Sequence, residues 1–152
     1  MEAREATAET AAQTVAQACA DAMWGNDRAS KAMGMSIQRI APGEAVLTMT
    51  VRPDMTNGHD ICHGGFIFTL ADSTFAYACN SHNKVTVAAG ASIEFLRPAH
   101  VGDVLTCEGV EQVLQGRHGI YDMKVSNQRG EVVAMFRGKS ASIQGSVIPE
   151  EP

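Results

Sequence analysis

The chain has 152 residues and a net charge of −5, which is enough length for one domain with a substantial core and too little for two. Apolar residues make up 45% and charged residues 19%, as in an ordinary globular protein, and the negative charge disfavours nucleic acid as a partner. No apolar run reaches the ~18 residues of a membrane-spanning helix, and neither a signal sequence nor a disulfide-type cysteine spacing is visible. We therefore expect a soluble protein of the reducing cytoplasm that does not bind membranes.

The first 34 residues are predicted to form a helical extension. Residues 8–24 are rich in alanine and other good helix formers, and residues 27–33 are predicted to form a short second helix ended by Gly34. From Met35 the period changes to a strict alternation, which is typical of a half-buried antiparallel hairpin turning at Pro42-Gly43. The positions expected to share the buried face of the second strand are Ala45, Leu47, Met49 and Val51.

A long apolar helix is predicted from Gly64 to Asn80, and four more strands follow it. Turn signals that contain Pro, Gly or Asn separate these strands, which we place at residues 86–96, 104–114, 120–126 and 132–143. The pattern predicts an α+β fold in which about six antiparallel strands wrap around one long central helix. The main domain is expected at residues 35–146, followed by a C-terminal tail at residues 147–152.

The central helix contains a single charged residue, Asp72. The run from Gly64 to Asn80 is apolar around most of its circumference, which is typical of a helix enclosed by other structure. Burying an ionised carboxylate without a partner is costly, so an Asp in this position requires a specific reason. Asp72 is therefore a candidate catalytic base or nucleophile, or else a buttress that accepts hydrogen bonds from its neighbours.

The start of this helix carries complementary chemistry. Backbone N–H groups in a first helical turn have no partner within the helix, and Gly64 has no side chain to block an approaching carbonyl. Its N–H could stabilise the negative charge that develops on a carbonyl oxygen under attack. His63 precedes it directly and Asn57 lies in the loop before, so both could orient a substrate or a water molecule. The simpler alternatives are a packing role for Gly64 and Gly65, a loop-stabilising role for His63, and a turn role for Asn57.

These residues form the pattern N-x5-HGG-x7-D, which resembles the hotdog-fold acyl-CoA thioesterases of the phenylacetic-acid-degradation type. The resemblance continues through Phe95-Leu96-Arg97-Pro98-Ala99, Gly102-Asp103, Gly116-Arg117 and Gly130-x-Val132-x-Ala134, and covers about residues 35–143. It implies a hotdog fold and hydrolysis of an acyl-CoA thioester to free coenzyme A and a carboxylic acid, with no cofactor besides the coenzyme A of the substrate. It favours an aryl-acetyl group such as phenylacetyl or its ring-hydroxylated forms.

The resemblance also implies roles for individual residues. Asp72 would be the nucleophile or the base, the Gly64 N–H would bind the carbonyl oxygen, and Asn57 and His63 would orient the thioester or water. The site would be shared between neighbouring subunits, so that a homodimer is the minimum active unit and a homotetramer the expected assembly. Some relatives carry a helper serine on the strand after the helix, whereas here residues 87–91 read VAAGA.

Basic residues in the C-terminal half are candidates for holding the phosphates of coenzyme A. Arginine suits phosphate because it binds in a bidentate manner. The alternative is that these are ordinary solvated surface charges. The candidates are Arg97, Arg117, His118, Arg137 and Lys139.

Three other functions are consistent with parts of the pattern. A non-catalytic acyl-CoA binding protein is possible, although it would not need Asp72, and an acyl-CoA hydratase or dehydratase would use His63 together with Asp72. His59, Cys62, Cys79 and His82 offer metal-ligand atoms, but their spacing is unlike a structural zinc site, and we expect no metal. An aryl pocket could be lined by Met55, Phe66, Phe68, Phe75 and Tyr77, which are equally good core residues.

Overall fold

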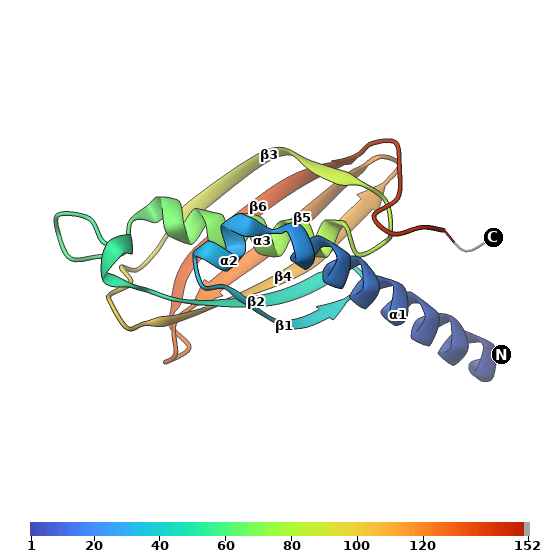
Figure 1. Cartoon of the computed structure of the whole chain (residues 1–152), viewed down its shortest axis with the longest axis horizontal. Coiled ribbons are helices and arrows are strands. Elements are labelled where there is room, and N and C mark those ends of the chain that lie inside the picture. Colours follow the sequence, from blue (N-terminus) through green and yellow to red (C-terminus); the bar gives the residue numbers. More distant parts are fainter. Residues whose placement is uncertain (151–152) are drawn as a thin grey trace.

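A computed structural model describes residues 1–150 of the chain and shows a curved sheet wrapped around one helix (Figure 1). The elements in chain order are α1 (Glu2–Asn26), α2 (Arg28–Ala32), β1 (Ser36–Ala41), β2 (Glu44–Thr50), a 3₁₀ turn (Pro53–Met55), α3 (Gly64–Cys79), β3 (Thr86–Phe95), β4 (Val104–Gln115), β5 (His118–Ser126) and β6 (Val132–Ser142). The predicted α+β architecture with six strands and a long central helix is confirmed. The N-terminal helix is longer than the predicted 8–24, and β5 begins two residues before the predicted 120 because Gly116, at φ 59°, allows a tight turn.

The six strands form a single antiparallel sheet in the order β1-β2-β4-β5-β6-β3. After β2 the chain runs through α3, crosses to the far side of the sheet as β3, and only then returns to fill the middle with β4, β5 and β6. This connection leaves β1 and β3 as the two edges. It also places α3 inside the curve, in contact with all six strands.

The core lies between α3 and the concave face of the sheet. In β2 the side chains of Ala45, Leu47 and Met49 are at most 1% exposed, as the alternation predicted. The ring of Phe75 on α3 packs 5.5 Å from that of Tyr121 and 6.0 Å from that of Phe136, measured between centroids. These contacts fix the rotation of α3 about its own axis, because the aromatic face must point into the sheet.

Helices α1 and α2 pack on the side of α3 that the sheet leaves open. Ala16, Cys19 and Ala20 are the buried positions of α1. Residues 2–14 are exposed, and the N-terminal turns of the helix extend beyond the body of the protein (Figure 1). Two side-chain hydrogen bonds join the extension to α3. The Tyr77 hydroxyl donates to Asp27 Oδ2 at 2.8 Å, and the hydroxyls of Ser30 and Ser73 lie 2.8 Å apart.

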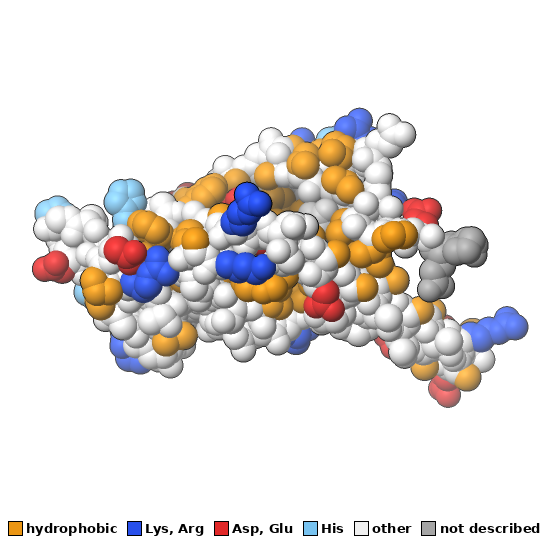
Figure 2. All heavy atoms as spheres, viewed as in Figure 1, with side chains coloured by type: hydrophobic (Ala, Val, Ile, Leu, Met, Phe, Trp, Pro, Cys, Tyr) orange, Lys and Arg blue, Asp and Glu red, His pale blue; other side chains and the backbone are white. Residues whose placement is uncertain are grey.

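Strand β3 is an unusually exposed edge. All residues from Val87 to Ser92 are exposed on both faces of the sheet, and hydrophobic side chains lie along the upper border of the molecule where β3 runs (Figures 1 and 2).

Among residues 1–150 no helix is long and apolar enough to span a bilayer. All four cysteines are free and buried. The segment after β6 returns toward β3, where the Ile148 N–H donates to Asn83 Oδ1 at 2.9 Å.

Candidate active site

Asp72 lies midway along α3 on a strip of the helix that is half-buried. Its carboxylate forms no hydrogen bond or ion pair with any of residues 1–150. Partial burial without a compensating donor raises the pKa of the Asp72 carboxyl above its ordinary value of 3.8. The predicted buttressing role is not supported, since Ser73 donates to or accepts from Ser30, and Thr74 donates to the Leu70 carbonyl.

The first turn of α3 has a free N–H group at Gly64. His63 is the N-cap, with φ −60° and ψ 132°, and its Nδ1 accepts a hydrogen bond from the Gly65 N–H at 3.2 Å. The Gly64 N–H has no partner among residues 1–150. A Cβ atom built on Gly64 would lie 2.9 Å from Cζ of Phe95. A glycine therefore suits the close packing against Phe95 here, and its N–H is left without a partner.

Asn57 combines a turn role with a position beside Gly64. Its backbone N–H donates to the Ile61 carbonyl, and its Oδ1 accepts from the His59 N–H at 2.9 Å. Asn57 therefore does stabilise the turn, as the simpler interpretation of the sequence expects. The side chain is half-buried and its Nδ2 donates to no atom of residues 1–150. The loop thus presents an amide donor next to the start of α3.

A cleft of about 570 Å³ opens at this end of α3. The sequence pattern does not predict this cleft. Its lining is mainly apolar and consists of Asn57, Ile61, Cys62, Gly64, Ile67, Phe95, Leu96, Arg97 and Pro98. Strand length could have revealed this arrangement. At ~3.3 Å per residue, β3 is longer than α3 at ~1.5 Å per residue, so a strand that runs back along the helix must end beside the helix start.

Asp72 does not line this cleft. It is eight residues beyond Gly64, or ~12 Å along the helix axis, whereas one reacting carbonyl would need both groups within ~3 Å. Within a single chain the two principal groups of the predicted mechanism are therefore apart. His63 is farther still from Asp72, and its Nδ1 is occupied by the Gly65 N–H.

The five basic candidates fall into two separate groups. Arg97 lines the cleft beside Gly64 and forms an ion pair with Glu131 at 2.7 Å. The others are Arg117, His118, Arg137 and Lys139, which lie at the β4–β5 turn and along β6. Arg137 binds Asp122 on the neighbouring strand in a bidentate manner at 2.6 and 2.7 Å, and this contact lowers the pKa of the Asp122 carboxyl.

The aromatic candidates differ in how accessible they are. Phe75, Tyr77 and Met55 are at most 1% exposed and belong to the core. Phe66 and Phe68 are half-buried, and Phe68 packs edge-on against Phe136 with ring centroids 5.2 Å apart. Phe68 precedes Asp72 by four residues and Phe75 follows it by three, so both neighbour the carboxylate on the helix, and of the two Phe68 is the more accessible.

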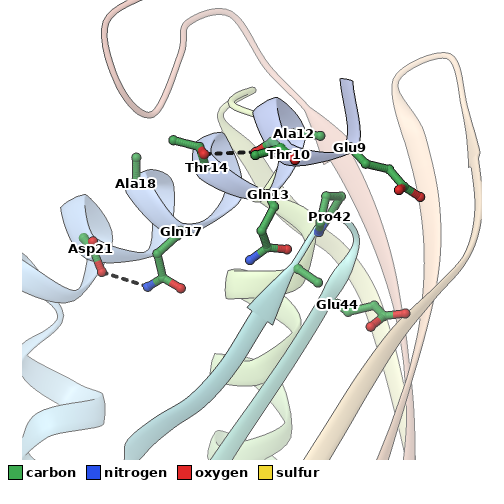
Figure 3. Close-up of a pocket in the computed structure, with 11 residues that line it drawn as sticks. Glu9, Thr10, Ala12, Gln13, Thr14, Gln17, Ala18, Asp21, Pro42 and Glu44 are labelled. Atoms are coloured by element: carbon green, nitrogen blue, oxygen red, sulfur yellow. Dashed lines mark hydrogen bonds between the residues drawn. The ribbon is translucent and has the colours of Figure 1, made fainter. Parts of the chain in front are cut away.

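Two other arrangements lack the required chemistry. A larger groove, of about 1090 Å³, lies between α1 and the turn from β1 to β2, but it is lined by Glu, Gln, Asp, Thr and small side chains and contains none of the predicted catalytic residues (Figure 3). Within residues 1–150 no three His, Cys, Asp or Glu side chains converge to hold a metal. The pair His59 and Cys62 precedes α3, whereas Cys79 and His82 lie at its other end.

Comparison with known proteins shows that this architecture is shared. Residues 59–134 match the thioesterase superfamily. The chain is 47% identical over 131 residues to acyl-coenzyme A thioesterase PaaI of Escherichia coli, covering 86% of this chain and 94% of that protein. The structure of the E. coli PaaI protein, from the phenylacetic acid degradation operon, superposes with a TM-score of 0.87 at 46% identity and covers 88% and 97% of the two chains.

Two further structures support the same assignment. Protein TT0310 of Thermus thermophilus has a TM-score of 0.75 at 36% identity, over 78% of this chain and 99% of that one. A hypothetical thioesterase protein of Streptococcus pneumoniae, in a structure with coenzyme A, has a TM-score of 0.70 at 25% identity, over 73% of this chain and 90% of that one. The fold and the residues at the start of α3 define a hotdog-fold protein of the thioesterase class. The chain belongs to the thioesterase superfamily, within its PaaI-type acyl-CoA thioesterases.

Asp72→Asn should raise the thermal unfolding midpoint at neutral pH. Since the pKa of the Asp72 carboxyl is raised in the folded protein, the fold favours the protonated group, and stability falls as pH rises from 3.8 through the raised pKa. Asparagine carries no charge and avoids that loss. Thermal unfolding monitored by circular dichroism at neutral and mildly acidic pH measures the difference, which should shrink in acid.

Asp122→Asn is the matched control with the opposite sign. Arg137 lowers the pKa of Asp122, so ionised Asp122 stabilises the fold above 3.8 and this contribution is lost as pH falls through the lowered pKa. Its replacement should lower the midpoint at neutral pH. A lower midpoint for Asp72→Asn as well would show that ionised Asp72 is held by a favourable contact.

Proposed function

We propose that this protein hydrolyses an acyl-CoA thioester, with Asp72 as base or nucleophile and the Gly64 N–H as oxyanion donor. The observation that carries the proposal is that α3 contains two polar groups without hydrogen-bond partners among residues 1–150. They are the half-buried carboxylate of Asp72 and the first-turn N–H of Gly64. The similarity to a protein named acyl-coenzyme A thioesterase supports the reaction class.

The chemistry follows from these two groups. The N–H stabilises the negative charge that develops on the thioester oxygen, and Asp72 removes a proton from the attacking water. The C–S bond then breaks, the acid keeps the water oxygen, and the proton passes to the departing sulfur of coenzyme A. The raised pKa of Asp72 favours this role, because a carboxylate that is poorly solvated is a stronger base. Direct attack by Asp72, followed by hydrolysis of the resulting anhydride, gives the same products.

We further propose that each site is built from two subunits. The ~12 Å along α3 between Gly64 and Asp72 is too long for one carbonyl to meet both groups of one chain. An antiparallel arrangement of two α3 helices would bring Asp72 of one next to Gly64 of the other. Pairing of the exposed β3 edges would satisfy their free backbone groups and set the helices in that arrangement. A homodimer is then the minimum unit, and a homotetramer is its proposed assembly.

For the acyl group we propose an aryl-acetyl unit such as phenylacetyl or a ring-hydroxylated form. The support is the accessible Phe68 next to Asp72 and the origin of the E. coli relative in a phenylacetic acid degradation operon. Medium-chain acyl groups are the competing class. The cytoplasm is the proposed location, consistent with four free, buried cysteines.

For the phosphates of coenzyme A we propose Arg97 as the first contact, since it lines the cleft that contains Gly64. Arg117, His118, Arg137 and Lys139 are proposed as contributors from a neighbouring subunit. The S. pneumoniae thioesterase structure with coenzyme A supports binding of this ligand by the fold. Arg137 is the weakest of these, because a phosphate would have to compete with Asp122.

Neither alternative activity has a specific observation in its favour. A non-catalytic acyl-CoA binding protein would have no use for an unpaired carboxylate that destabilises its helix. A hydratase needs an imidazole and a carboxylate converging on neighbouring carbons, whereas the Nδ1 of His63 caps α3 by accepting a hydrogen bond from the Gly65 N–H.

Asp72→Asn should lower kcat at least ~100-fold, a loss of about 2.7 kcal/mol of transition-state stabilisation. The substitution keeps the size of the side chain but removes the charge that activates water. Steady-state hydrolysis of phenylacetyl-CoA and hexanoyl-CoA provides the measurement, with Asp54→Asn, at an exposed position beside Arg52, as the control. Near-normal turnover by a folded Asp72→Asn protein would show that Asp72 is structural.

Gly64→Pro should lower kcat by about 10²–10³-fold, because proline has no N–H to place in the oxyanion site. Proline is well tolerated at the first position of a helix, and the extended backbone of His63 suits a residue before proline. Gly64→Ala is the matched control, since it keeps the N–H and its Cβ meets only the tip of the Phe95 ring. If both variants lose activity equally, steric fit and not the N–H is what Gly64 provides.

Mixing Asp72→Asn and Gly64→Pro proteins should restore activity that neither has alone. In a heterodimer one of the two shared sites combines an unmutated Asp72 with an unmutated Gly64, so random exchange should recover about a quarter of the wild-type rate. Exchange is verified by mass spectrometry of differently tagged chains. If exchange is complete and the mixture stays inactive, each site lies within one chain.

A further inference from the structure

The loop that joins the 3₁₀ turn to α3 contains the dipeptide Asn57-Gly58. It projects from the end of the molecule where α3 begins (Figure 1), and Gly58, His59 and Asp60 at its tip are exposed. The Asp60 N–H donates to the Asn57 carbonyl at 3.1 Å, which makes Asn57 the first residue of a β-turn. The turn itself does not require glycine at its second position, because the φ of Gly58 lies outside the left-handed region.

Gly58 places a free backbone nitrogen next to the Asn57 side chain. Its N–H forms no hydrogen bond with any of residues 1–150, and a Cβ atom built on it would meet nothing within 4 Å. Because Gly58 also has no side chain of its own, its nitrogen is little hindered from bonding to Cγ of the preceding asparagine. That bond would close a five-membered ring.

The side-chain amide of Asn57 is held in a position that favours this ring closure. Its Oδ1 accepts from the His59 N–H at 2.9 Å, which folds the amide back over the following peptide bond. The same hydrogen bond stabilises the negative charge that develops on Oδ1 when Cγ is attacked. The Asn57 Nδ2 donates to no acceptor among residues 1–150, so no contact retains it as a leaving group.

Two other asparagines of the chain lack this combination. Asn127 makes the same turn contact, with its Oδ1 accepting from the Arg129 N–H at 3.0 Å, but it is only 4% exposed and the next residue carries a long side chain. Asn80 is 6% exposed, and its side chain both donates to and accepts from the backbone of Thr86. Of these three, only Asn57 combines a following glycine, a solvent-exposed turn and a free leaving group.

We propose that Asn57 is a site of spontaneous deamidation. The Gly58 N–H loses its proton, the nitrogen bonds to Asn57 Cγ, and the Cγ–Nδ2 bond breaks, so that the amide leaves as ammonia with that proton. Water then opens the resulting succinimide at either carbonyl and yields aspartate or isoaspartate. No group is oxidised or reduced, and water is the only co-reactant.

The product alters the cleft at the start of α3, because Asn57 and Gly64 both line it. Deamidation replaces an amide with a carboxylate and adds one negative charge beside the helix N-terminus. This carboxylate competes for the Gly64 N–H and repels the oxyanion that the N–H is proposed to stabilise. The predicted loss of activity rests on the proposed function, whereas the deamidation itself does not.

The test incubates the full chain at mildly alkaline pH, where the attacking nitrogen loses its proton more readily, and combines peptide mass spectrometry with hydrolysis of phenylacetyl-CoA. The peptide that contains Asn57 should gain about 1 Da and separate into aspartate and isoaspartate forms. The peptides that contain Asn80 and Asn127 should stay unchanged. The kcat should fall in proportion to the converted fraction, and Asn57→Asp should have a kcat at least ~10-fold below wild type.

Gly58→Ala is the matched control, since its Cβ meets nothing and the turn keeps its hydrogen bonds. It should start at the wild-type rate of hydrolysis and deamidate about tenfold more slowly. An Asn57 that stays intact in the folded wild type, or that converts equally fast in Gly58→Ala, would overturn the inference. Conversion with unchanged kcat would overturn its effect on the cleft. If fresh wild-type protein hydrolyses neither phenylacetyl-CoA nor hexanoyl-CoA, the proposed function fails, and the mass measurement alone decides the deamidation.

Discussion

Helix α3 can lie against the concave face of the sheet because two strands carry glycine where the helix approaches. A Cβ atom at Gly138 of β6 would lie 2.8 Å from the Phe75 ring, and one at Gly109 of β4 would lie 3.1 Å from Cγ2 of Thr74. Close packing on this side leaves the opposite side to α1 and α2, and only a narrow strip of the helix is left half-buried. Asp72 lies on that strip. The contact between helix and sheet thus determines both the stability of the core and the direction in which the carboxylate points.

The fold was predictable because its signals are local. Alternation in residues 44–51 gave the buried face of β2, and the continuous apolar run gave α3. The first turns of α1 were not predicted, since they pack against nothing and their alanines carry no periodic pattern. The start of β5 was missed for another reason: Gln115 pairs with His118 across a two-residue turn, which the polar composition of residues 115–118 does not distinguish from a longer loop.

The candidate site divides in the same way. Asp72, Gly64 and His63 could be found from sequence because their chemistry depends on positions along one helix, such as a lone charge or a first-turn N–H. The arrangement of the basic candidates could not be predicted from the sequence. The ion pair of Arg137 with Asp122, for example, depends on the register between β5 and β6. Nothing in the sequence distinguishes Ser140 from other serines in strands. Its hydroxyl becomes notable only in the structure, where it is buried and has no hydrogen-bond partner among residues 1–150. Residues whose role depends on long-range packing are those that sequence reasoning misses.

The burial of all four thiols has a practical consequence for enzymology. Cys19, Cys62, Cys79 and Cys107 are at most 5% exposed, and burial raises the pKa of each, so very little reactive thiolate is present near neutral pH. A chromogenic aromatic disulfide added to the solution would therefore react with released coenzyme A and leave the folded protein untouched. Turnover can be followed continuously in this way without a protein background, and a late rise in colour would report unfolding.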